Sequence, residues 1–121
     1  MKVSYVEFLG QKHPLCFSLA ASEKILEAFK SLENMSDAIT GDDLANKVHA
    51  IDRVLQILMK AGRIYASACG EDLPPELPCR PAALIDVRDP KPPQAIVAVT
   101  RSASGRTVGA AGTNGKPASD Q

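Results

Sequence analysis

Residues 41–69 read GDDLANKVHAIDRVLQILMKAGRIYASAC, and this stretch decides the fold. Its apolar side chains recur at alternating steps of four and three residues, the spacing that keeps one stripe of an α-helix against a partner. Asp42 or Asp43 can act as the N-cap, because a short carboxylate accepts backbone N–H groups that have no partner within the helix. The sequence therefore predicts one long central helix. Its stripe consists of Leu44, Val48, Ile51, Leu55, Leu58 and Tyr65, with Gly62 in the one gap.

The stripe of this helix has two possible roles. It can be ordinary intramolecular core, or it can form a partly exposed groove for a helix of another protein. Further apolar residues widen the stripe, so the helix is expected to be covered on more than one side, and both roles can hold together. The opposite face is polar and is expected to be solvated. The apolar residues that widen the stripe are Val54, Ile57, Met59 and Ile64; the polar face carries Asn46, His49, Asp52, Arg53, Gln56, Lys60 and Arg63.

Composition limits the class of protein. A chain of 121 residues is expected to form one domain. The 14 basic and 14 acidic residues balance, whereas a protein dedicated to nucleic acid or anionic membrane usually carries a basic excess. We therefore expect neither nucleic acid nor a membrane as a partner. No apolar run approaches the roughly 20 residues that span a bilayer. Three cysteines leave at least one unpaired, and the first residues do not resemble a signal peptide. We therefore expect a soluble protein of a reducing cytoplasm.

The N-terminal third is expected to form a β-hairpin followed by helix. Residues 2–8 and 13–18 are short extended candidates, with Gly10 in the reversal between them. Pro14 lacks an N–H and belongs at a sheet edge or a bulge. Ser18 or Ser22 can cap a helix over the following residues. A second helical piece covers residues 31–40, and the sequence leaves open whether the two pieces are continuous.

Prolines divide the C-terminal part of the chain. Residues 71–81 contain four prolines and are expected to form an extended connector, with Pro81 opening a short helix. Residues 94–100 fit either a strand or a helix, and helix is preferred. From residue 104 the chain is rich in Gly, Ala and Ser, which predicts a flexible tail over 104–121. The expected fold is a mainly α, small α+β domain over residues 1–103: a helical bundle around one long central helix, with a short N-terminal β-hairpin.

Patterns that carry chemistry are missing from the sequence. Its cysteines and histidines do not have the spacing of metal ligands, and its glycines form no phosphate-binding loop. His49 and Asp52 lie three residues apart on the polar face, where such pairs are usually surface groups. Gly41-Asp42-Asp43 lacks the alternating ligands of a calcium loop, so we interpret it as a helix cap. We expect no catalytic residue, no metal and no cofactor, and hence no enzyme.

Several stretches together resemble the small tail assembly chaperones of long-tailed bacteriophages and prophages. Those proteins open with a strand, a turn, a Pro-Leu-x-Phe-Ser-Leu segment and a helix ending in Phe-x-Ser-Leu-Glu. The likeness covers about residues 3–90 and departs at Pro90–Pro93, where relatives are more helical. The stretches that carry it are residues 5–19 (YVEFLGQKHPLCFSL), 29–33 (FKSLE), 41–44 (GDDL), 61–65 (AGRIY) and 70–75 (GEDLPP).

The resemblance implies a non-enzymatic chaperone that binds the tape-measure protein of the tail before the tail tube polymerises around it. A tape-measure protein is long, helical and apolar in stripes, so unassembled copies expose surface that aggregates. The first candidates for partner contact are Leu44, Val48, Ile51, Leu55 and Leu58. One alternative is a structural tail-tube or tail-completion protein that self-associates into rings through the hairpin edges. A small enzyme is a third hypothesis, which a bound cofactor or a polar pocket would revive.

Overall fold

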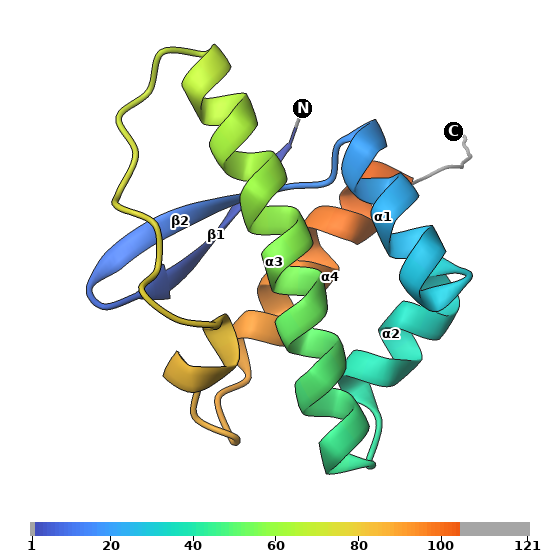
Figure 1. The fold of residues 1–121 in the computed structure, drawn as a ribbon. Helices are drawn as coiled ribbons and strands as arrows, with labels where there is room; N and C mark the ends of the chain where they lie inside the picture. The colour runs from blue at the N-terminus through green and yellow to red at the C-terminus, as the bar shows by residue number, and fades with distance from the viewer. Residues whose placement is uncertain (1, 105–121) are drawn as a thin grey trace, which may run out of the picture.

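The long helix expected from residues 41–69 is α3, which spans Leu44–Ala68. The structure is a computed structural model that describes residues 2–104. It is mostly helical with one N-terminal hairpin, so the small α+β fold class is confirmed. The other elements are β1 (Val3–Phe8), β2 (Gln11–Cys16), α1 (Leu19–Phe29), α2 (Leu32–Thr40), the short 3-10 helix η1 (Pro81–Leu84) and α4 (Lys91–Ser104) (Figure 1).

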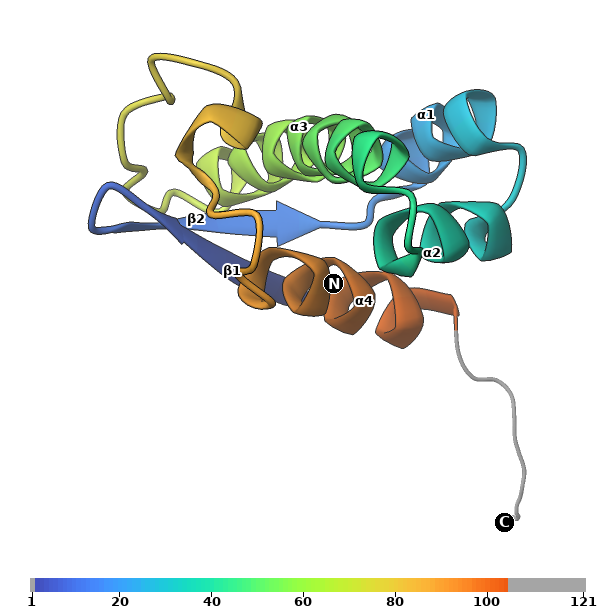
Figure 2. The same ribbon diagram turned by 90° about the horizontal axis from the view of Figure 1, so that it is seen from below.

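The elements form three layers. The β1–β2 hairpin lies between α3 on one face and α4 on the other (Figure 2). Helices α1 and α2 pack against α3 beyond the end of the hairpin (Figure 1). One cluster of buried apolar side chains runs through all of these elements. Among the described residues, no helix combines the length and the apolar character needed to cross a membrane.

The hairpin turn is tighter than expected. The antiparallel strands pair from Val3 with Cys16 to Phe8 with Gln11, which leaves only Leu9 and Gly10 as the loop. Both loop residues have positive φ, 53° and 76°, as a two-residue turn of the primed type requires. Leucine in this region is strained because its Cβ crowds the following carbonyl. The second strand therefore begins two residues earlier than residue 13, and it ends at Cys16.

Helices α1 and α3 begin at caps that the sequence indicated, and α2 begins at a cap that it did not. Ser18 accepts from the Ala21 amide at 3.1 Å, and Asp43 caps α3 by accepting from Asn46 at 3.3 Å. Lys30 ends α1 at a φ of 78°. Ser31 then caps α2, so the two helical pieces are separate.

Gly62 sets the distance between α3 and the hairpin. A Cβ added at this position would collide with the backbone carbonyl of Pro14 in β2. The gap that Gly62 leaves in the apolar stripe is thus a point of close backbone approach. It lets Leu15 and Leu55, both fully buried, belong to one core.

The C-terminal part forms a connector and two helical segments. Pro81 opens η1, as expected. The ambiguous residues 94–100 lie in the helix α4, which confirms the preference for helix. Pro92 and Pro93 fall in its first turn, where the N–H that proline lacks has no partner within the helix. The predicted tail over 104–121 lies, apart from Ser104, outside the described residues.

Candidate functional site

The stripe of α3 divides into a covered part and an uncovered part. Leu55 and Leu58 are fully buried, so in this folded state they have no surface to offer another protein. Leu44 and Val48 remain 54% and 39% exposed. Ile51 lies at the boundary, buried but lining a groove. The candidate set for partner contact therefore narrows to the first two turns of α3.

The exposed end of the stripe forms one wall of a groove. The opposite wall comes from η1 and the residues that lead from it into α4, which lie beside the first half of α3 (Figure 1). The groove encloses about 220 Å³. Val87, on the opposite wall, is 57% exposed. We define the apolar groove by Leu44, Val48, Ile51, Ile85, Val87 and Pro93, with Lys47, Asp86 and Asp89 also among its lining residues.

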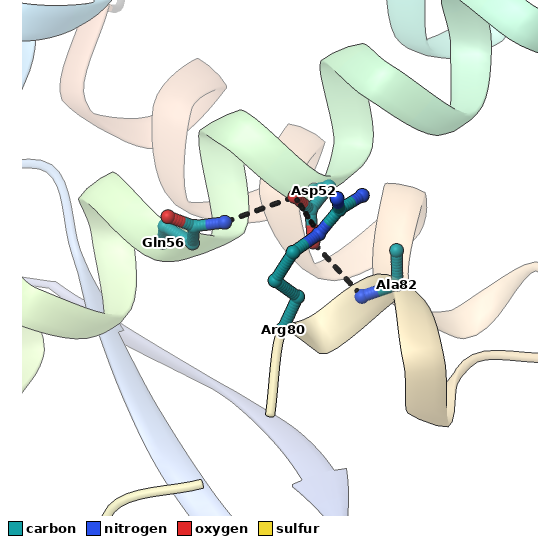
Figure 3. A network of polar contacts seen from close by, with 4 residues as sticks. All are labelled: Asp52, Gln56, Arg80 and Ala82. Atoms are coloured by element: carbon teal, nitrogen blue, oxygen red, sulfur yellow. Dashed lines mark hydrogen bonds and ion pairs between the residues drawn. The ribbon is translucent and has the colours of Figure 1, made fainter. Parts of the chain in front are cut away.

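Asp52 fixes the position of the opposite wall. One of its carboxylate oxygens accepts from the Ala82 backbone N–H at 2.9 Å, and the other accepts from the Gln56 amide at 2.9 Å. Arg80 Nε lies 3.2 Å from that second oxygen (Figure 3). The Asp52 side chain is 8% exposed, whereas that of Arg80 is 68% exposed. A nearly buried charge is tolerated when donors surround it, and here two of its three donors come from the start of η1.

This burial corrects the expectation that Asp52 lies on a solvated face. His49, three residues earlier, is exposed, as expected. Asp52 instead points to a segment that follows it by about 30 residues. The two side chains form no hydrogen bond or ion pair with each other. The Asp52 carboxylate thus contacts Gln56 and the start of η1, and not His49.

The three cysteines lie in different environments. Cys16 is buried in the core, while Cys69 and Cys79 are exposed, and none of the three forms a disulfide. The pKa of the Cys16 thiol is raised above its usual value, chiefly because burial disfavours the charged thiolate. Residues 2–104 contain no group of three or more Cys, His, Asp or Glu side chains placed to hold a metal ion.

Sequence reasoning missed the second wall of the groove. Ile85 and Val87 lie between two proline-rich breaks, and no periodicity there indicated that they would face α3. The burial of Asp52 is what marks this wall, and burial can be seen only in the folded structure. No protein-family model, curated protein or solved structure that was compared with the chain matches it.

Proposed function

We propose that this protein is a non-enzymatic tail assembly chaperone, which binds the tape-measure protein in the host cytoplasm before the tail tube polymerises. The docking site in this proposal is the apolar groove. The observation that carries it is the exposure of Leu44, Val48 and Val87 around one apolar hollow. Exposed aliphatic side chains scattered singly are normal on protein surfaces, whereas a group that lines a hollow is typical of an interaction site.

The groove has the dimensions of a helix-binding site. From Leu44 to Ile51 it follows α3 for two turns, about 10 Å of helix axis. A partner helix that crosses it can present aliphatic side chains at positions i, i+3 or i+4, and i+7. An apolar cavity of about 150 Å³ accommodates benzene, so the volume of about 220 Å³ is suited to one or two aliphatic side chains.

The groove also favours a partner with basic residues beside its apolar stripe. Asp86 and Asp89 line the groove together with Lys47, giving an acidic excess of one charge. Both carboxylates are already held in place by local hydrogen bonds to backbone amides, at 2.8 Å from Arg88 and 3.0 Å from Lys91. We therefore commit to an amphipathic helix of the tape-measure protein with at least one Lys or Arg flanking its apolar residues.

The expected affinity is modest, as an assembly chaperone requires. Each fully buried aliphatic side chain contributes roughly 1.5–3 kcal/mol, but Leu44, Val48 and Val87 are already about half covered. Association also costs several kcal/mol in lost freedom of movement. One groove then supports weak binding, which polymerising tube subunits can displace.

Co-expression tests the proposal. The tape-measure protein of the same phage or prophage is expected to stay soluble with the wild-type chain and to precipitate with Val48→Asp, which places a charge in the groove. Leu19→Asp is the matched control, because Leu19 is 89% exposed on α1, away from the groove.

A second experiment, light scattering, separates the chaperone from the ring-forming alternative. Light scattering of the purified chain without partner should give no closed ring. A stable ring that survives Val48→Asp, or a tape-measure protein that precipitates whichever variant is present, would count against the proposal.

A further inference from the structure

A second hollow lies on the other side of η1 and is lined by more charged side chains than the apolar groove. It encloses about 620 Å³ between the second half of α3, strand β2 and the connector that precedes η1. We call it the basic hollow and define it by His13, Gln56, Lys60, Arg63, Glu76 and Arg80.

The charges around the basic hollow are unbalanced. Lys60, Arg63 and Arg80 contribute three positive charges, and Glu76 is the one acid among the lining residues described. Within residues 2–104, Arg80 pairs with Asp52, but Lys60 and Arg63 have no carboxylate oxygen within 4.0 Å. The chain as a whole has no net charge, so this local excess is a feature of the site.

Arg63 is held in position for a ligand. Its Nη1 donates to the Pro74 carbonyl at 2.7 Å, which ties the connector to α3. A guanidinium has five N–H donors, so this bond leaves four for another acceptor. Arg63 is half-buried, whereas Lys60 is exposed, and a charge-assisted hydrogen bond is stronger where water is partly excluded.

His13 lines the same hollow and has one buried ring nitrogen without a partner. The residue is 2% exposed, and its Nδ1 is buried without a hydrogen-bond partner. The Phe8 ring packs edge-on at 5.9 Å between centroids, which leaves that side of the imidazole apolar. Leaving a buried donor or acceptor unpaired costs about 1–3 kcal/mol. The imidazole lines the hollow, so its resonances can report on a bound ligand.

We infer that the basic hollow binds a carboxylate, presented by an acidic side chain of another protein. Because Asp52 pairs with Arg80 and Glu76 offsets a second cation, the hollow keeps a net excess of one positive charge, which one carboxylate complements. A phosphate dianion carries one negative charge more than this excess offsets, so it matches the hollow less well than a carboxylate. The site lies outside the apolar groove and goes beyond the proposed function, so either one can fail while the other stands.

An NMR titration of the full chain tests the inference. The probe is the capped tripeptide acetyl-Ala-Glu-Ala-amide, and the neutral control is the same peptide with Gln. We expect the His13 imidazole and the Arg63 side-chain resonances to shift with the Glu peptide alone, with a Kd of about millimolar strength. Unchanged resonances up to about 50 mM, where such a site is saturated, would overturn the inference. Tighter binding of inorganic phosphate at equal ionic strength would also overturn it.

Three substitutions should change the Kd of the Glu peptide, two of them raising it and one lowering it. Lys60→Gln should raise the Kd about threefold, as for an exposed charge pair, and Arg63→Gln about tenfold. Glu76→Gln should lower the Kd about threefold, because it removes the repelling charge. Lys24→Gln, an exposed lysine on α1, is the control and should have no effect. Because Arg63 also holds the connector, Lys60→Gln and Glu76→Gln decide the outcome: equal Kd values for both and for the wild type would refute the site.

Discussion

Replacing Asp52 with alanine removes a buried carboxylate that ties η1 to α3. The carboxylate accepts two hydrogen bonds and one ion pair (Figure 3). A hydrogen bond to a charged group contributes roughly 1.5–3 kcal/mol, and a buried donor left unpaired is costly in addition. The hydrogen bonds from the Ala82 backbone N–H and from the Gln56 side chain end on the same carboxylate, so their contributions to stability do not simply add. The ion pair to Arg80 contributes at most about 1 kcal/mol, because that side chain is 68% exposed.

We therefore expect Asp52→Ala to cost about 2–4 kcal/mol, concentrated in the contact between η1 and α3. Hydrogen exchange of the Ala82 amide reports on that contact directly, because this N–H donates to Asp52. Its exchange should accelerate by roughly 30-fold or more. Urea unfolding should show a smaller loss if η1 detaches before the core opens.

Two control variants sharpen this prediction. Asp52→Asn keeps one oxygen for the Ala82 amide and should lose less protection than alanine. Arg80→Gln should change the protection by no more than about fivefold, because only the exposed ion pair is removed. Unchanged exchange at Ala82 in Asp52→Ala would refute the claim that this carboxylate holds the wall of the apolar groove.

Three further predictions test the packing and the turn. Gly62→Ala should destabilise the chain by about 1–3 kcal/mol in urea unfolding despite better helix propensity, because the new Cβ meets the Pro14 carbonyl; an unchanged midpoint would contradict the close approach. Burial and the charge of Arg63 lower the pKa of His13 below its usual 6.5, so the unfolded chain binds the proton first. Stability should then fall with decreasing pH below about 6.5, by up to about 1.4 kcal/mol per pH unit. This slope should vanish in His13→Gln and persist in His49→Gln. Leu9→Asn should raise the free energy of unfolding by about 0.5–1 kcal/mol, because asparagine tolerates positive φ in a two-residue turn; a loss of stability would contradict the turn assignment.

Local patterns were enough to predict most of the fold. The four-and-three spacing located α3, and Ser18 and Asp43 were identified as possible caps because the capping bond reaches only three residues along the chain. The sequence did not predict the two-residue hairpin loop or the break between α1 and α2, because each depends on a backbone conformation that its residue type does not favour. Leu9 and Lys30 both adopt positive φ, one closing the hairpin and the other separating α1 from α2.

The candidate site was predictable in part, since a stripe indicates which residues share a face but not what covers them. Leu44 and Leu55 are equivalent in the pattern, yet one is exposed and the other fully buried. The difference arises from contacts distant in sequence, where the hairpin covers the later turns of α3 and η1 stops short of the first ones. Asp52 is the clearest case, because its backbone partner follows it by 30 residues.

The most direct test of the account is the affinity of the apolar groove for a partner helix. Fluorescence anisotropy can measure the Kd of labelled helical segments of the tape-measure protein for the wild-type chain, Val48→Asp and Leu19→Asp. The account predicts saturable binding of at least one segment, with a Kd at least tenfold higher for Val48→Asp and unchanged for Leu19→Asp. Equal affinity for the wild-type chain and Val48→Asp, or no binding to any segment, would contradict it.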